Sequence, residues 1–84
     1  MYLLIQVILH LNQSLPSVNV VSKFEMLDIC ENKLEKISHR FKNPEYLSFL
    51  GSDEENNKFL KLTQKNNGLI SYWTCKDIIF LNNS

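Results

Sequence analysis

Apolar residues recur at helical spacing between residues 22 and 41, and this stretch is the clearest element of the chain. They follow one another at steps of three and four, which places them on one face of an α-helix. These positions are Phe24, Leu27, Cys30, Leu34, Ile37 and Phe41. Ser22 and Glu25 match a capping box at the start, and Pro44 ends the pattern. The spacing therefore predicts one long capped helix over 22–41.

The first eleven residues show a shorter period. Every second residue from Leu3 to Leu11 is apolar, whereas the residues between them are mixed. This alternation, with its β-branched residues, favours a strand over the alternative of a helix with a narrow polar stripe. Residues 12–21 then connect the strand to the helix, and Val18, Val20 and Val21 can add a short extended segment.

Two short helices are predicted in the middle of the chain. Asn43, Pro44 and Glu45 have the order of a helix start, and Gly51 is placed as a stop, which predicts a helix over 44–50. The run Ser52-Asp53-Glu54-Glu55 repeats the capping-box pattern. It favours a helix over 53–65, with a loop and then a strand over 58–65 as the alternative.

The last part of the chain is rich in β-branched and aromatic residues. Leu69–Cys75 and Ile78–Leu81 read as two short strands joined near Lys76 and Asp77. With a length of 84 residues, we expect one small α+β domain over 1–84. It has an N-terminal strand, the long capped helix, one or two short helices and a C-terminal β-hairpin.

Charge and cysteine content narrow the class of protein. Nine basic residues balance nine acidic ones, so the formal net charge is zero. This balance lacks the basic excess typical of nucleic-acid binders, and it leaves little repulsion to oppose self-association. The apolar N-terminal run is too short to span a bilayer and lacks a basic flank, so we expect no membrane partner. Cys30 and Cys75 are taken as reduced thiols of a cytoplasmic, intracellular protein, with one disulfide as the alternative.

Motifs for catalysis and for cofactors are missing from the sequence. The histidines and cysteines have no close metal-ligand spacing, no serine lies in a nucleophile elbow, and two glycines are too few for a phosphate loop. The acidic run at 53–55 is explained as a helix start. We therefore expect no enzyme, no metal and no cofactor.

The order of the last elements resembles the second half of a winged-helix domain. Glu45–Gly51, with the sequence EYLSFLG, resembles that family's E-L-A-x-x-L-G helix, and Asn67–Ile70 resembles the segment that opens its hairpin. The resemblance implies DNA binding through a recognition helix at 53–65 and the hairpin at 69–81. The contact residues that it implies are Asn57, Lys58, Lys61, Gln64 and Lys65.

Aromatic and apolar residues favour a different function. Tyr72 and Trp73 are neighbours in a predicted strand, so their side chains point to opposite faces and one of them needs a cover. Tyr2 and Leu4, in the apolar N-terminal strand, raise the same need. We expect a small non-catalytic protein-interaction module: a homodimer, an accessory subunit, or an inhibitor or regulator of a larger partner. The DNA-binding regulator is the alternative.

Overall fold

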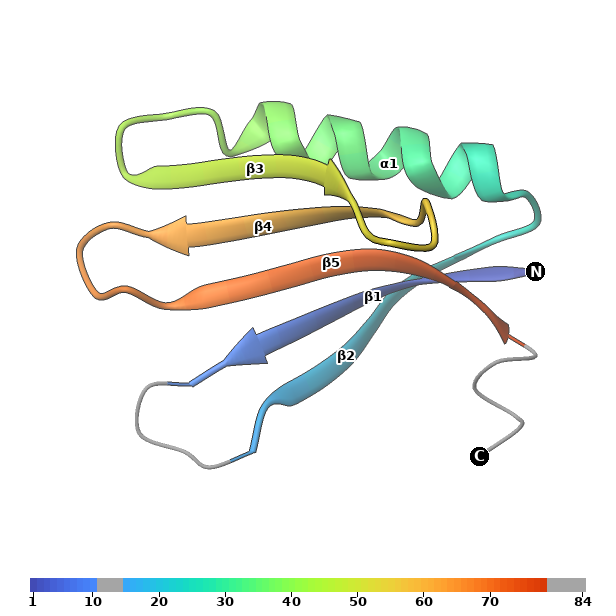
Figure 1. The fold of residues 1–84 in the computed structure, drawn as a ribbon, viewed down its shortest axis with the longest axis horizontal. Coiled ribbons are helices and arrows are strands. Elements are labelled where there is room, and N and C mark those ends of the chain that lie inside the picture. Colours follow the sequence, from blue (N-terminus) through green and yellow to red (C-terminus); the bar gives the residue numbers. More distant parts are fainter. Residues whose placement is uncertain (11–14, 79–84) are drawn as a thin grey trace.

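A five-stranded antiparallel sheet with one helix against one of its faces makes up the fold (Figure 1). The computed structural model describes residues 1–10 and 15–78. The elements are β1 (Tyr2–Leu9), β2 (Ser17–Phe24), α1 (Leu27–Arg40), β3 (Tyr46–Ser52), β4 (Lys58–Gln64) and β5 (Ile70–Asp77). The strands lie in the order β2-β1-β5-β4-β3, and each is antiparallel to its neighbours. The molecule is therefore mostly sheet, which corrects the predicted fold of one long helix, short helices and a terminal hairpin.

The predicted N-terminal strand is confirmed as β1, an inner strand of the sheet. It pairs with β2 along one edge and with β5 along the other. Leu3, Leu4 and Ile5 are all buried, on alternate faces. An inner strand with side chains buried on both faces accounts for the nearly continuous apolar run in the sequence.

The predicted helix is shorter than expected, because its first residues belong to a strand. Ser22 pairs with Leu4 in the sheet, and β2 continues to Phe24 before α1 begins at Leu27. No side chain caps the helix start at Met26, so the capping box is wrong. Pairing with β1 satisfies the backbone groups of β2 that face this neighbour along the whole strand, which outweighs a local capping pattern.

The two short helices predicted over 44–50 and 53–65 are also wrong. Their residues form β3, and a turn followed by β4. At the start of β3 the Glu45 N–H donates to Asn43 Oδ1 over 2.9 Å, and at the turn the Glu55 N–H donates to Asp53 Oδ1 over 2.9 Å. Asn and Asp make this kind of contact both in turns and at helix starts, so the sequence pattern fits either structure.

The C-terminal hairpin is corrected as well. β5 runs without a turn from Ile70 to Asp77, and its partners are β4 and β1. The predicted turn near Lys76 therefore lies within this strand. Residues 79–84, which include most of the second predicted strand, lie outside the described residues.

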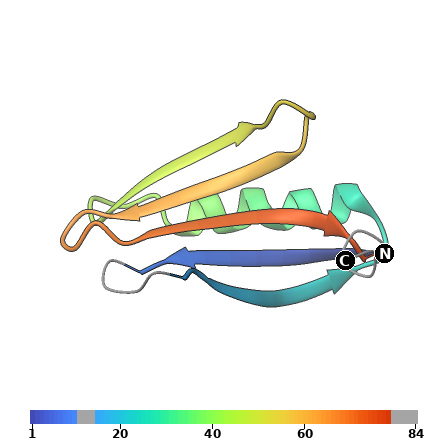
Figure 2. The same ribbon diagram turned by 60° about the horizontal axis from the view of Figure 1, so that its bottom comes forward.

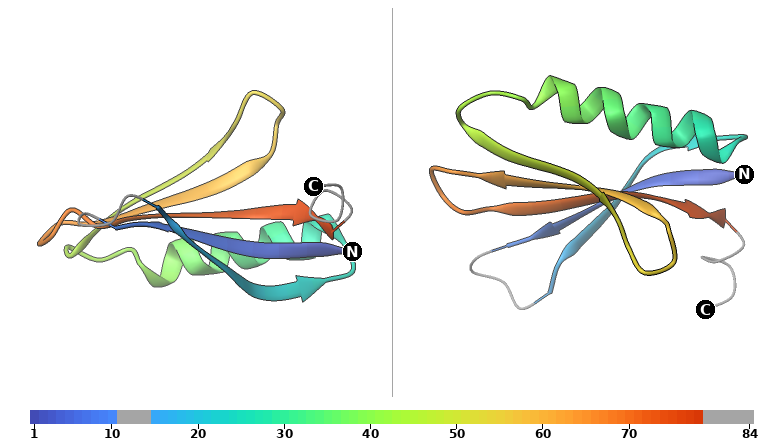
Figure 3. Two further views of the ribbon diagram at one scale, coloured as in Figure 1. Left: turned by 90° about the horizontal axis from the view of Figure 1, so that it is seen from below. Right: turned by 45° about the horizontal axis from the view of Figure 1, so that its top comes forward.

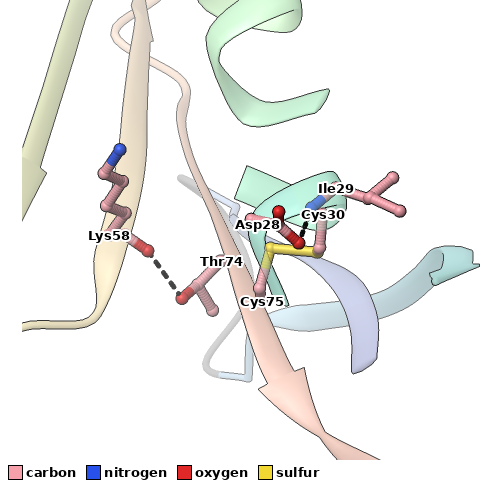
Figure 4. The surroundings of a disulfide bond; sticks show 6 residues. All are labelled: Asp28, Ile29, Cys30, Lys58, Thr74 and Cys75. Carbon is pink, nitrogen blue, oxygen red and sulfur yellow. Dashed lines mark hydrogen bonds between the residues drawn. A yellow bond between two sulfur atoms is a disulfide. The ribbon is translucent and has the colours of Figure 1, made fainter. Parts of the chain in front are cut away.

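The core lies between α1 and the sheet. Leu34 of α1 is fully buried together with Leu4 and Leu60 of the sheet. At the first half of the helix, Cys30 is joined to Cys75 of β5 by a disulfide (Figure 4). The expectation of two reduced thiols is therefore wrong, because the helix face and the central strand that carry the cysteines pack against each other.

Candidate interaction surface

One face of the sheet has no helix against it. Side chains alternate between the two faces of a strand, and Leu4, Leu60, Leu62 and Cys75 point toward α1, so the residues beside them point away. We call these positions the helix-free face. It consists of Leu47, Phe49 and Gly51 of β3; Phe59, Lys61 and Thr63 of β4; Ile70, Tyr72, Thr74 and Lys76 of β5; Leu3, Ile5, Val7 and Leu9 of β1; and Val18, Val20 and Lys23 of β2.

Strand register arranges this face in rows. One row crosses the whole sheet as Phe49, Lys61, Tyr72, Val7 and Val18. The rows on either side of it are as apolar, and a further row consists of Lys76, Leu3 and Lys23. The polar side chains of the face are Lys23, Lys61, Thr63, Thr74 and Lys76. The strands thus present a broad apolar surface to the side opposite α1.

Several side chains of the helix-free face are open to solvent. Val18 is 63% exposed, Phe49 59%, Val20 58% and Leu47 57%. These positions lie on the two outer strands, β2 and β3, and Leu9 of β1 is 38% exposed. Exposed apolar residues gathered on one face of a small protein are typical of an interaction surface.

An aromatic cluster lies at the β3–β5 side of this face. The ring centroids of Phe49 and Phe59 are 5.9 Å apart, and those of Phe59 and Tyr72 are 6.4 Å apart. Lys61 Nζ lies 5.9 Å from the Tyr72 ring centroid, a cation–π arrangement. Gly51 leaves room for this packing, since a Cβ there would lie 2.6 Å from the Phe49 ring.

The helix side of the sheet is more polar where α1 does not cover it. Toward β1 and β2 its positions include Gln6, Ser17 and Asn19. A cavity of about 170 Å³ lies there, near the end of α1. It is lined by Gln6, Ile8, Phe41, Tyr46, Leu62, Gln64, Leu69, Ser71 and Trp73.

Four of the polar side chains of this cavity already pair with one another. Gln64 Nε2 donates to the Tyr46 hydroxyl over 3.2 Å, and Trp73 Nε1 donates to Ser71 Oγ over 3.1 Å. The lining has no carboxylate, imidazole or thiol, and its volume is below the roughly 300–1,000 Å³ of ordinary ligand pockets. The cavity is therefore a weaker candidate for a functional site than the helix-free face.

The residues predicted for a protein interface are divided between the two faces. Tyr72 lies on the helix-free face and is half-buried, and Trp73 points to the helix side, as their alternation predicted. Tyr2 is half-buried on the helix side and packs against the core. Leu4 is completely buried there, so its side chain is not available to a partner.

The residues predicted to contact DNA do not share a surface, because the predicted recognition helix is a strand. Lys58 Nζ lies 3.3 Å from Glu35 Oε1 of α1, whereas Lys61 is on the helix-free face. Gln64 donates to Tyr46 on the helix side. Asn57 lies in the turn before β4, and Lys65 follows β4 at its other end. This geometry gives no support to the recognition helix.

The turn between β3 and β4 carries the acidic residues Asp53, Glu54 and Glu55. The backbone N–H groups of Asn57 and Glu55 donate to Asp53 Oδ1 and hold the pKa of this carboxyl below its ordinary value of 3.8. Asn56 has a φ of 66°, which Asn tolerates better than most residues. In Figures 2 and 3 the tip of this hairpin rises from the sheet on the side opposite α1. The acidic turn thus overhangs the helix-free face.

Sequence reasoning missed most of this surface. The sequence pattern predicts a helix at Leu47 and Phe49, and at Val18 and Val20 a connection that can add a short extended segment. The structure places these residues in β3 and β2. In both segments the apolar residues alternate with Ser48 or Asn19, which is the period of a strand. The signal is short, and Asn43 and the run Ser52-Asp53-Glu54-Glu55 match the pattern of a helix start.

The described part of the chain shows neither a metal site nor a membrane-spanning helix. It brings together no group of three or more side chains that bind metal ions, and no helix in it is long and apolar enough to cross a bilayer. Comparison with known proteins found no match to a family model, to a curated protein or to a solved structure.

Proposed function

We propose that this protein is a non-catalytic interaction module whose helix-free face packs against a protein partner. The observation that carries the proposal is the contrast between the two faces of the sheet. The face without a helix carries apolar side chains on all five strands, together with Lys23, Lys61 and Lys76, whereas the helix side becomes polar beyond α1.

The energetics of burial support this assignment. Each Å² of apolar surface removed from water contributes about 25 cal/mol, so an open face of this composition favours association. Phe49 and Tyr72 belong to the residue types that are enriched in protein interfaces. Lys61 packs along Tyr72 and adds a directional charge within this apolar surface.

The disulfide is informative about the cellular compartment of the protein. The sequence predicts two reduced thiols and a cytoplasmic location. The bond between Cys30 and Cys75 favours an oxidising compartment instead, where disulfides form and persist. Alkylation of the protein from its native source, before and after reduction, tests this part of the proposal by mass spectrometry. Cysteines that react with the alkylating agent before reduction would instead support a cytoplasmic location for the protein.

Site-specific photo-crosslinking tests the interaction surface. Phe49 and Leu50 are neighbours in β3, both are exposed, and their side chains point to opposite faces of the sheet. A photoreactive phenylalanine analogue at position 49 is expected to crosslink to protein in cells that express the chain. The same analogue at position 50 is the matched control and is expected to give far fewer adducts.

The contrast between the two positions decides the outcome. Adducts at position 49 in clear excess over position 50 agree with a partner on the helix-free face. Equal yields at both positions, or no adduct at position 49, contradict the proposal.

A further inference from the structure

We infer that the outer edge of β3 pairs with β3 of a second copy of this chain, in antiparallel orientation about a two-fold axis that crosses the sheet at Phe49. The two five-stranded sheets then join into one continuous sheet, with both helices on the same side of it. The pairing uses an edge of the sheet and leaves the helix-free face open to a partner. The inference therefore goes beyond the proposed function and does not rest on it.

The outer edge of β3 carries backbone groups without partners. β3 bonds to β4 through its odd-numbered positions, because the Lys65 N–H donates to the Glu45 carbonyl where the pair begins. Alternation along an antiparallel strand then directs the N–H and C=O groups of Ser48 and Leu50 outward. Within the described ranges, no residue bonds to these backbone groups. Figure 2 shows β3 as the outer strand, with α1 behind the sheet, so this edge is open to a further strand.

The two edges of the sheet differ in their protection against such pairing. In β2, Val21 is an extra residue opposite β1, and the same strand carries Lys23. Bulges and lysines are the devices that usually keep an edge strand from pairing. β3 pairs with β4 in unbroken register from Tyr46 to Ser52 and has no charged residue and no proline. β3 is therefore the edge at which a further strand fits.

Side-chain sizes along β3 identify β3 itself as this strand. One antiparallel register pairs all seven residues of both copies, and it places Ser48 opposite Leu50, as their outward backbone groups require. In this register every large side chain lies opposite a small one, except at the axis. The pairs are Tyr46 with Ser52, Leu47 with Gly51, Ser48 with Leu50, and Phe49 with Phe49. A strand that is complementary to itself favours a second copy over an unrelated partner.

Phe49 supplies the main contact across the axis. It is exposed on its own sheet, and aromatic residues directly opposite each other stabilise antiparallel pairs. Its ring lies over Gly51, since a Cβ there would lie 2.6 Å from the ring. Leu47 of the other copy is opposite Gly51 in the proposed register and packs against this ring. The pairing thus covers Leu47 and Phe49, the two most exposed apolar side chains of β3.

Charges of both signs meet at the two ends of the pairing. Glu45 of one copy lies next to the acidic turn at 53–55 of the other. Lys65 is opposite Glu45 in the β3–β4 pair, and Lys76 lies against the acidic turn. Charge therefore does not select the partner, and backbone pairing and side-chain size carry the inference. A single pair of strands makes a small interface, so we expect a dimer that dissociates on dilution.

Sedimentation velocity of the purified, oxidised chain over a range of concentrations tests the inference. The wild type is expected to shift from monomer to dimer. Phe49→Lys places two lysines opposite each other at the axis and is expected to weaken the dimer by at least about tenfold. Val18→Lys adds the same charge at an exposed position of the same face, on the opposite edge of the sheet. It is expected to leave the dimer unchanged, and circular dichroism verifies that both variants fold.

A mixed sample tests the register. Phe49→Glu places two carboxylates at the axis and is expected to weaken the dimer as Phe49→Lys does. An equal mixture of the two variants is expected to dimerise, because opposite charges then meet at the axis. The mixture responds in this way only where position 49 of one copy lies opposite position 49 of the other.

Three results would overturn the inference. They are a wild type that stays monomeric at all concentrations, a dimer that Val18→Lys weakens as much as Phe49→Lys, and a mixture that forms no more dimer than either charged variant alone. None of them touches the proposed function, which concerns the face and not the edge. In the photo-crosslinking experiment, an adduct between two copies has twice the mass of the chain and is expected at both position 49 and position 50. The comparison of the two positions therefore counts adducts with other proteins.

Discussion

Cys30 and Cys75 form the covalent link between the helix and the central strand. They lie 45 residues apart in the sequence, and the bond closes a loop that includes most of α1, β3 and β4. A crosslink over such a loop reduces the conformational entropy of the unfolded chain. In a chain of 84 residues with a limited core, this contribution is large compared with the whole stability.

Removal of the disulfide is therefore expected to destabilise the protein strongly. The chain-entropy relation for this loop length gives a loss of about 4 kcal/mol in the free energy of unfolding. Urea unfolding of the wild type with and without a reducing agent measures the effect. The double variant Cys30→Ala/Cys75→Ala is the control, since its midpoint must not respond to the reducing agent. A wild-type midpoint that is also unchanged by reduction would contradict the disulfide.

Asp53 organises the turn between β3 and β4 through its carboxylate. Because the folded-state pKa lies below the ordinary value of 3.8, the carboxylate stabilises the turn at higher pH. This contribution is lost as the pH falls through the folded-state pKa. Asp53→Asn keeps a side-chain oxygen for the turn and removes the titrating group.

An NMR titration of the Asp53 side-chain carboxyl carbon is expected to give a pKa below 3.8. Protonation should also shift the backbone N–H signals of Asn57 and Glu55, which donate to this carboxylate. In Asp53→Asn the same two signals are expected to lose their acid-induced shift. A pKa at or above 3.8 would show that the turn does not hold the carboxylate as described.

Asn43 and Asp53 also explain why the middle of the chain was predicted as helix. Each side-chain oxygen accepts the N–H of the residue two positions later. Helix starts and turns use the same short polar residues for such contacts, so one sequence cannot distinguish them locally. Pairing of β3 with β4 and of β4 with β5 decided the outcome, and that information is not local.

At the scale of elements, α1 depends on one buried face. Leu34 is fully buried against the sheet, whereas Ile29 is 47% exposed on the same helix. An isolated helix of 14 residues is marginal in water, so packing against the sheet supplies most of its stability. Substitutions at Leu34 and Ile29 can therefore be compared, one in the core and one on the surface of the same helix.

Leu34→Ala is expected to lower the free energy of unfolding by about 2–5 kcal/mol, because it opens a cavity in the core. Ile29→Ala is expected to change it by about 0.5 kcal/mol or less, as surface positions usually do. Chemical unfolding compares the two variants. Similar losses at both positions would contradict the proposed placement of the helix face.

Elements with an uninterrupted period were predictable from the sequence. The alternation of residues 3–11 predicted β1, and the three- and four-residue steps predicted the apolar face of α1. The start of α1 was not predictable, because Ser22 and Glu25 match a capping box although Ser22 pairs with Leu4 in the sheet. Competition between a local motif and a strand partner is settled by tertiary structure.

At the scale of the whole molecule, the sheet has two faces of different character. α1 covers one face, and no helix covers the other, on which Leu47 and Phe49 are exposed. The sequence predicted the opposite orientation of Tyr72 and Trp73 and the need for a cover. It could not predict which outer strands complete the surface, because the strand order places β3 and β2 at the edges.

The most direct test of the central claim compares photo-crosslinks from position 49, on the helix-free face, with those from position 50, on the other face of the same strand. The account predicts adducts with other proteins at position 49 in clear excess over position 50. Equal yields at the two positions, or no such adduct at position 49, would contradict the account.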